Sequence, residues 1–204
     1  AFRLTFAGGL THTSTGILPN GTNGYANTFF TPSIHINLTD YASLGIYSRT
    51  NSIDAIQRID MDCQVFSSPN GGDFGIFAGF STALPVSQFI VEFTQAENFT
   101  YRLAQINPTP NTTGFWAGSQ NGSTMYFQRN GIDLSPTLSP KLANRVVPNN
   151  ALTIFAQRYQ TATIRRYSNR ELAFSFIGEK LTESQLSNYY TAVQAFQTTL
   201  SRQV

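Results

Sequence analysis

Charged side chains are scarce in this sequence. Asp, Glu, Lys and Arg make up 12% of its 204 residues, about half of the roughly 25% that is usual in globular proteins. The formal net charge is only +2, so the strong positive field of a nucleic-acid-binding surface is missing, and we expect no nucleic-acid partner. Ser, Thr, Asn and Gln take the place of the charges, as in many proteins that work outside cells or in assembled particles.

Cysteine and long apolar runs are nearly absent as well. Cys63 is the only cysteine, which excludes an internal disulfide, and we expect a buried free thiol. No apolar run approaches the roughly 18 residues of a transmembrane helix, so we expect no membrane insertion. The sequence opens at Ala1 without a signal peptide or an initiator Met, which suggests a processed chain or a domain of a longer one.

Residues of the kinds that carry familiar chemistry are also few. The sequence has two histidines, His12 and His35, and no Gly-x-Ser-x-Gly nucleophile motif. No metal-binding Cys/His spacing, phosphate-binding glycine loop or dinucleotide fingerprint occurs. We therefore expect no catalytic residues, and we take both histidines as ordinary surface or strand residues.

Turn signals, in contrast, are dense. Asn-Gly pairs occur at 20–21, 23–24, 70–71, 121–122 and 130–131, and both residues of the pair tolerate the positive φ of a tight hairpin turn. Short runs rich in Phe, Ile, Val, Tyr and Thr lie between turns, at 44–48, 53–66, 74–80, 89–93, 100–104, 114–119, 124–129, 151–158 and 172–177. Proline-rich loops at about 105–113 and 134–150 separate some of them. This pattern predicts an all-β sandwich or barrel, and no linker or repeat divides residues 1–204, so we expect a single domain.

The end of the sequence has a helical period instead. Thr182-Glu183-Ser184-Gln185 has the pattern of a capping box, in which the Thr and Gln side chains each bond the other residue's backbone N–H. Apolar side chains then follow at helical spacing, at Leu186, Tyr189, Tyr190, Val193, Phe196 and Leu200. The spacing predicts an amphipathic helix over about 183–200 whose apolar stripe packs on the outside of the sandwich. Binding of a partner by that stripe is the alternative.

Several stretches resemble a known family. They lie at 20–28 and 41–50, at 114–119 and 126–131, at 172–181, and in the helical tail through residue 200. They are similar to laminin-G-like, concanavalin A-like lectin/glucanase domains of the kind found in bacteriophage structural proteins such as tail, fibre and decoration proteins. The pairing of the Ile-Gly-x-x-Leu-Thr turn at 177–182 with the capped aromatic helix is the more specific part of this resemblance.

The resemblance implies an antiparallel jelly-roll β-sandwich of the concanavalin A-like type. It implies a non-enzymatic, lectin-like binding or attachment module on a virion or extracellular surface. Such a module contacts glycans, a cell-surface receptor or neighbouring subunits, and a homo-oligomer is one arrangement that it allows. A purely structural virion or decoration module without sugar binding is the alternative.

A glycoside hydrolase of the same superfold is a second alternative. The retaining glucanases of this fold place acidic residues at alternate positions of one strand. The nearest match is Asp60-Met61-Asp62, which puts two carboxylates on one strand face. Val65 and Phe66 stand where a further Glu would be required. The hydrolase is therefore less favoured than a binding module.

Calcium is a further implication of the resemblance, because laminin-G-like sandwiches often bind it through carboxylates and carbonyls. Asp60, Asp62 and Asp73 are the candidate ligands. No ligand-dense loop is visible around them, so solvated carboxylates without a metal, and no cofactor, are the favoured reading.

A sugar site needs an aromatic face and a few planar polar groups. Trp116 is the only Trp and alternates with Phe115 and Ala117, so it points outward if those two point into the core. The candidate ligand-binding residues are Trp116, Tyr126, Gln128, Arg129, Asn130 and Asn121, on that strand and the hairpin that follows. The alternative is a Trp116 buried in the core, where most large aromatic side chains lie.

Basic residues concentrate late in the sequence, at Lys141, Arg145, Arg158, Arg165, Arg166, Arg170 and Lys180. They could form a patch for an anionic glycan or a neighbouring subunit. A solvated face is the alternative.

Overall fold

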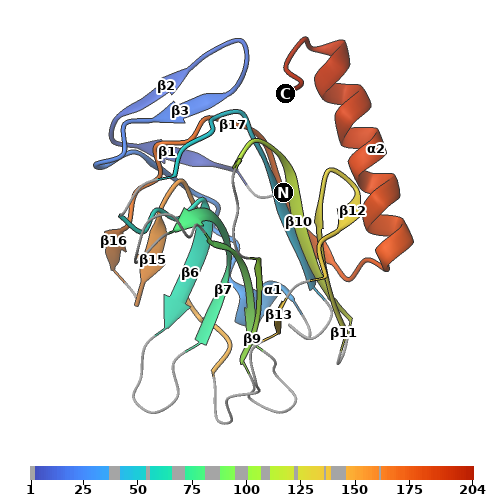
Figure 1. The fold of residues 1–204 in the computed structure, drawn as a ribbon. Coiled ribbons are helices and arrows are strands. Elements are labelled where there is room, and N and C mark those ends of the chain that lie inside the picture. Colours follow the sequence, from blue (N-terminus) through green and yellow to red (C-terminus); the bar gives the residue numbers. More distant parts are fainter. Residues whose placement is uncertain are drawn as a thin grey trace.

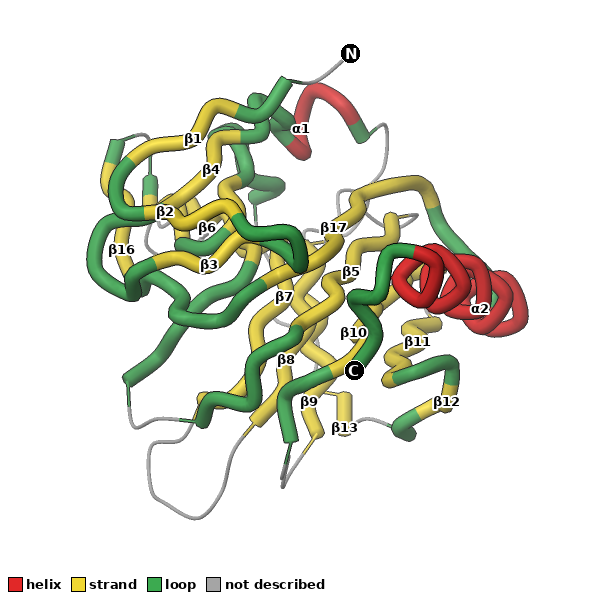
Figure 2. The backbone as a smooth tube through the Cα atoms, turned by 90° about the horizontal axis from the view of Figure 1, so that it is seen from above, coloured by secondary structure: helices red, strands yellow, loops and turns green. Residues whose placement is uncertain are grey.

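The computed structural model of the chain describes residues 3–36, 42–53, 56–65, 72–80, 88–94, 101–106, 111–121, 124–135, 137–138, 146–160 and 162–204. These residues form an all-β sandwich of two large sheets with a long helix at the C-terminal end. The helix lies against the outer face of one sheet (Figure 1). Figure 2 shows the resulting order of layers, from β7 and β8 through β5 and β10 to the helix.

One sheet has ten strands. Its main path runs β1 (Thr5–Ala7), β4 (Tyr25–Asn27), β14 (Thr153–Ile154), β6 (Met61–Val65), β7 (Gly72–Phe80), β8 (Gln88–Thr94), β9 (Tyr101–Ile106) and β13 (Thr137–Leu138). Two more strands, β15 (Gln157–Tyr159) and β16 (Thr163–Arg165), branch from β6, and the β15–β6 pair is parallel.

The other sheet has seven strands, and every pair in it is antiparallel. Its order is β12 (Ile132–Asp133), β11 (Thr124–Arg129), β10 (Gly114–Asn121), β5 (Ala42–Ser48), β17 (Leu172–Glu179), β3 (Ile17–Pro19) and β2 (Leu10–His12). A four-residue helix, α1 (Pro32–His35), precedes β5, and α2 (Glu183–Thr199) follows β17.

The core lies between the two sheets. The ten-stranded sheet contributes Met61, Cys63, Phe74 and Ile76, and the seven-stranded sheet contributes Leu44, Ile46, Trp116 and Phe127. Cys63 is a buried free thiol, so that prediction is confirmed. No helix in the described part of the chain is long and apolar enough to cross a membrane.

Strand β10 is buried on both faces, and this reverses the orientation expected for Trp116. The indole packs in the core between the sheets with 1% of its surface exposed, and its Nε1 donates a hydrogen bond to Thr112 O at 3.2 Å. Phe115 and Ala117 point the other way, toward α2. The expectation that Trp116 points outward is therefore wrong, because the helix gives the outer face of this sheet an apolar cover of its own.

Helix α2 packs on that outer face, as its apolar stripe predicts. Its capping box is present, with Thr182 accepting from the Gln185 N–H and Gln185 accepting from the Thr182 N–H. Aromatic rings fill the interface, and the Phe176 and Tyr189 rings lie 4.6 Å apart.

The last turn of α2 departs from the predicted stripe. Phe196 is 50% exposed and Leu200 is 40% exposed, whereas Gln197 is buried. The chain after the helix folds back toward the sheet, where Val204 N donates to the Tyr47 hydroxyl at 3.0 Å. This segment therefore covers the Gln197 side of the last turn rather than the Phe196 side.

The Asn-Gly pairs adopt two different turn geometries. Asn130 and Gly131 both have positive φ, at 50° and 75°, as the tight hairpin turn between β11 and β12 requires. Gly131 also lies so close to α2 that a Cβ there would be 2.6 Å from Tyr190 Cδ1. Asn20 works through its side chain, because Oδ1 accepts from the N–H groups of Thr22, Asn23 and Gly24.

Candidate functional site

The residues predicted to bind a sugar do not form one surface. Trp116 opposes Arg129 in the β10–β11 register, and Ala117 opposes Gln128. Trp116 and Arg129 therefore share the inner face of the sheet, whereas Gln128 and Tyr126 lie on the outer face. The expectation that Tyr126 and Gln128 flank Trp116 is wrong, because the hairpin register puts them on opposite sides.

The polar members of that set hold the fold together. Gln128 Nε2 donates to Glu183 O at 3.1 Å and anchors the start of α2. Arg129 donates to Thr113 O through Nε and Nη2 and lies 4.9 Å from the Trp116 ring centroid. Asn130 Oδ1 accepts from the Phe115 N–H at 2.8 Å, and Asn121 ends β10.

Asp60 is an internal ion-pair partner rather than an open carboxylate. Its Oδ1 and Oδ2 accept from Arg170 Nε at 2.8 Å and from Nη2 at 3.0 Å. The side chains of Arg170 and Asp60 are 1% and 0% exposed. Ser168 Oγ donates to Asp60 Oδ1 at 2.9 Å.

Asp62 and Asp73 lie apart from that pair, on the outward face of strands β6 and β7. Met61 opposes Ile76 and Val65 opposes Gly72, so alternation puts both carboxylates on the same face. Burial, and then the charge of Asp73, raise the pKa of the Asp62 carboxyl well above its ordinary value. Gly75 makes room for this carboxylate, because a Cβ there would lie 2.4 Å from Asp62 Oδ1.

Asp60, Asp62 and Asp73 therefore do not meet as three ligands of one ion. Among the residues that the structure describes, no three His, Cys, Asp or Glu side chains gather as a metal-binding group. Calcium binding stays a prediction. Burial also raises the pKa of the Cys63 thiol, so this cysteine is not set up as a thiolate nucleophile.

Arg165, Arg166 and Arg170, three of the basic residues late in the sequence, make hydrogen bonds within the protein. Arg165 Nε and Arg166 Nη1 both donate to Gln157 Oε1, at 2.8 and 3.0 Å, and the Arg165 guanidinium lies 3.6 Å from the Tyr159 ring centroid. Gln157 in turn donates to Asp62 Oδ2. Arg170 pairs directly with Asp60, whereas Arg165 and Arg166 are linked to Asp62 only through Gln157. These three arginines of the predicted patch therefore make internal contacts, and Lys180 is exposed. Lys141 and Arg145 lie outside the described residues.

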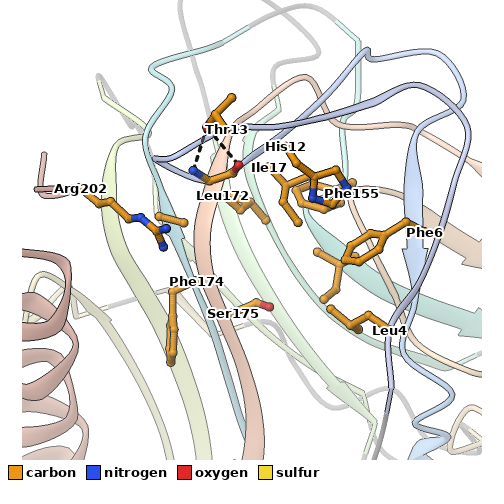
Figure 3. A pocket seen from close by; sticks show the side chains of 13 residues that line it. Leu4, Phe6, His12, Thr13, Ile17, Phe155, Leu172, Phe174, Ser175 and Arg202 are labelled. Atoms are coloured by element: carbon orange, nitrogen blue, oxygen red, sulfur yellow. Dashed lines mark hydrogen bonds between the residues drawn. The ribbon is translucent and has the colours of Figure 1, made fainter. Parts of the chain in front are cut away.

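An open cavity of about 270 Å³ lies where β17 faces the N-terminal strands. Phe6 of β1 and Leu4 just before that strand approach it from one side, and Phe174, Ser175 and Arg202 approach it from β17 and the chain after α2 (Figure 3). Its other lining residues are His12, Thr13, Gly16, Ile17, Ile154, Phe155, Leu172 and Ala173.

A second cavity of about 260 Å³ adjoins the first. The two share Leu4, Ile154 and Ser175 in their linings. The second continues along β17 past Phe176 and Ile177 and reaches Thr28, Phe30 and Met61. We call the two cavities together the edge groove. Its floor is made of core side chains, so a ligand that enters it is in contact with the interior of the sandwich.

The edge groove exists because β17 is paired on one side only for most of its length. Its residues pair with β5 from Leu172 to Glu179, whereas β3 pairs with β17 only through Leu172 and Ile17. Within the described ranges no strand pairs with the outer edge of β17 beyond Leu172. The sandwich is thus open between β17 and the β1–β4 pair.

Phe155 forms part of the floor in a strained backbone conformation. Its φ is +69° and it is 3% exposed, which is unusual for a bulky residue. Its N–H donates to Asp60 O and its carbonyl accepts from the Ser168 N–H, both at 2.7 Å. These two hydrogen bonds hold the conformation of Phe155. Their partners, Asp60 and Ser168, lie in the two segments that also form the Asp60–Arg170 ion pair.

The polar groups of the groove gather at one end. Arg202 Nε donates to Ser14 O at 2.7 Å, and the guanidinium lies beside the cavity. The His12 and Phe6 rings meet edge to face, 4.9 Å apart. Neither cavity is lined by Asp or Glu. The nearby Glu171 accepts from the Thr13 and Thr15 hydroxyls and pairs with Arg49 at 3.5 Å. Arg202 is the one Asp, Glu, Lys or Arg side chain in the two linings, so it supplies a positive charge at this end of the groove.

No protein-family model matches the sequence, and no curated protein matches it. The laminin-G-like resemblance therefore stays a prediction, and the geometry of the described residues is the basis for a functional proposal.

The groove residues carry no recognisable signal in the sequence. Phe6 and His12 come from separate short strands, and Arg202 comes from the far end of the chain. The chain folding that brings them together is non-local. One clue is available: the long apolar strand β17 is followed directly by a helix. This pattern does not indicate which strand pairs with the second edge of β17.

Proposed function

We propose that the protein is a non-enzymatic binding or attachment module whose ligand occupies the edge groove. The observation that carries the proposal is an open, apolar groove that reaches the core and bears a cation at one end. Ligand sites generally combine an apolar lining with a few placed polar groups, and Arg202, His12 and Thr13 supply them here. The opening is lined mainly by strands of the scaffold, which fix the positions of these side chains.

A hydrolase fits the described geometry less well. Glycoside hydrolysis needs two carboxyl groups on either side of the scissile bond, about 5–10 Å apart. The linings of the edge groove contain no carboxylate. Asp60 is buried in its ion pair with Arg170, and Asp62 is fully buried. We therefore propose that Asp60 and Asp62 serve the stability of the fold rather than catalysis.

We propose a jelly-roll sandwich of the concanavalin A-like type and a place on a virion or extracellular surface. The antiparallel pairing of strands distant in sequence, such as β5 with β10 and β17, supports the first. The resemblance alone supports the second. Because Trp116 is buried, it cannot supply the exposed aromatic face that we expected for a sugar site. This favours contact with neighbouring subunits over glycan binding.

The test is a screen followed by matched variants. A glycan array and a displayed peptide library are both probed with the natural protein, and the hits are tested again with Phe6→Ser and with Ile132→Ser. Phe6 lines the groove and is 41% exposed, whereas Ile132 is 68% exposed on β12. We expect Phe6→Ser to lose the hits and Ile132→Ser to keep them. Hits that ignore both changes, or release of reducing sugar from an arrayed glycan, would overturn the proposal.

A further inference from the structure

We infer that the ligand of the edge groove is an extended peptide strand, which pairs its backbone with the free edge of β17 and sets a carboxylate against Arg202. This inference rests on the proposed function and names the class of ligand. It follows from three features of the groove: its backbone edge, its two apolar cavities and its charge.

The backbone edge is the first feature. From Phe174 to Glu179, β17 pairs only with β5 among the described strands. Alternate residues of a strand turn their N–H and C=O groups toward the opposite edge, so those groups of β17 face the groove. An unpaired sheet edge is a template for another extended chain, and peptide recognition by strand addition uses this geometry. A glycan offers no matching ladder of donors and acceptors.

The two cavities are the second feature. Each has about 260–270 Å³, and a cavity of roughly 150 Å³ already admits a benzene molecule. Each can therefore take one branched or aromatic side chain. Alternate side chains of a strand point the same way and lie roughly 7 Å apart. Because the cavities adjoin at Leu4, Ile154 and Ser175, a strand on the β17 edge can fill both with residues i and i+2.

The charge is the third feature. Phe174 and Arg202 lie on one side of β17, and Leu4 and Phe6 lie on the other (Figure 3). The side chain between two inward-pointing apolar residues therefore faces Phe174 and Arg202. No carboxylate lines either cavity, so the Arg202 charge has no acidic partner in the groove. The fitting peptide has an apolar–acidic–apolar pattern, or ends there in its own carboxylate.

The test uses three synthetic peptides and amide chemical shifts of the ¹⁵N-labelled full chain. The first probe is acetyl-Thr-Ile-Glu-Ile-Thr-amide, and the second has Gln in place of Glu. The third has Gln and a free C-terminal carboxylate, which separates a side-chain carboxylate from a terminal one. We expect saturable binding of a carboxylate peptide below about 1 mM, with shifts concentrated on residues 173–179.

Two controls make the contacts specific. Methylating the backbone nitrogens of the peptide residues that face β17 removes donors, and we expect roughly two- to tenfold weaker binding per hydrogen bond lost. Arg202→Gln should remove the preference for the carboxylate peptide, about two- to fivefold. Arg202→Lys should keep it. Phe6→Ser should weaken every peptide.

Each remaining outcome overturns the inference. These outcomes are no saturable binding by any of the peptides, binding indifferent to N-methylation, or shifts away from β17. Shifts at residues 173–179 that grow with protein concentration alone would assign the groove to a second copy instead. Glycan hits that depend on Phe6 while no peptide binds would sink this inference and leave the proposed function standing. Failure of both screens would end both.

Discussion

The ion pair between Arg170 and Asp60 is surrounded by protein on all sides. Besides the two bonds to Asp60, Arg170 donates to Ser52 O and Arg58 O, both at 3.3 Å. These contacts join the loop before β6 to the chain just before β17. A buried charge whose partner is removed costs far more than the pair itself contributes, because the remaining ion is left without water or a counter-charge.

We expect Arg170→Met to reduce the free energy of unfolding by about 3–5 kcal/mol, since Asp60 would remain buried and unpaired. Urea unfolding followed by circular dichroism measures the loss. Arg170→Met combined with Asp60→Leu should recover part of it, because no buried ion is left. Arg3→Met, at an exposed position, is the control for the change of residue type. A loss below about 1 kcal/mol would show that water reaches the pair.

Asp62 predicts a pH dependence of the opposite sign to an ordinary ion pair. Its folded-state pKa is raised by burial and by Asp73. An unfolded Asp has a pKa of about 3.9, so the folded state holds this proton more tightly. The contribution of Asp62 to folding stability is therefore fully present below the unfolded-state pKa and is lost as the pH rises through the folded-state pKa.

Asp62→Asn should therefore gain stability relative to the natural protein as pH rises from about 4. The neutral amide keeps an oxygen to accept from Gln157 and carries no charge to desolvate. Denaturant midpoints at a series of pH values would show the two curves diverging. Asp133→Asn, on the exposed strand β12, is the matched control for the change of residue type. If the midpoints of Asp62→Asn and of the natural protein changed with pH in parallel, the pKa of the Asp62 carboxyl would not be raised by folding.

Residues with local partners were predictable from the sequence and residues with distant partners were not. Thr182 and Gln185 are three positions apart, and their capping box is confirmed. Cys63 is buried as its residue type predicts. Asp60 was taken as a surface carboxylate because its partner, Arg170, is 110 positions away. Nothing in the sequence near Asp60 marks that pairing.

Helix α2 covers a cluster of apolar side chains on the outer face of the seven-stranded sheet, and its loss would expose most of that cluster. Leu186 and Val193 are buried against Tyr47 and Phe115, and Tyr189 and Tyr190 pack around them. An isolated helix of this length is marginal in water. Its stability therefore comes from this contact and from the cap at Thr182.

We expect Thr182→Ala to cost about 1 kcal/mol of unfolding free energy through the lost cap, and Leu186→Ala to cost about 2–5 kcal/mol through the cavity it leaves. Thr191→Ala, exposed in the middle of the helix, is the control and should stay within about 0.5 kcal/mol. Equal effects of Leu186→Ala and Thr191→Ala in thermal unfolding would mean that α2 is not docked.

At the element scale, existence was easier to predict than orientation. The helix expected over 183–200 is observed at Glu183–Thr199. The strand expected at 114–119 is β10, Gly114–Asn121. Which face of β10 carries Trp116 could not be predicted, because its run is apolar on both faces and either parity buries a large side chain. Among the described residues of the run at 53–66, the strand covers Met61–Val65. Just before it, Arg58 and Asp60 make side-chain hydrogen bonds to distant parts of the chain.

The sandwich as a whole places its only Trp between the two sheets. We expect a blue-shifted Trp116 emission that acrylamide quenches weakly in the folded protein. If the two sheets and α2 unfold together, the red shift of this emission in urea should coincide with the loss of far-ultraviolet circular dichroism. A red-shifted emission in native buffer, or two separated transitions, would contradict a common core.

Arg202 belongs to two parts of the molecule at once. It follows α2 by three residues, its N–H donates to Gln197 O, and its carbonyl accepts from Arg49. Its guanidinium stands at the groove. Docking of the helix end and occupation of the groove are then reciprocally coupled: a ligand that binds Arg202 in place must slow hydrogen exchange in the last turn of α2, and fraying of that turn must weaken the ligand by the same factor. The C-terminal segment would thus act as a reporter of occupancy, readable without labelling the ligand at all.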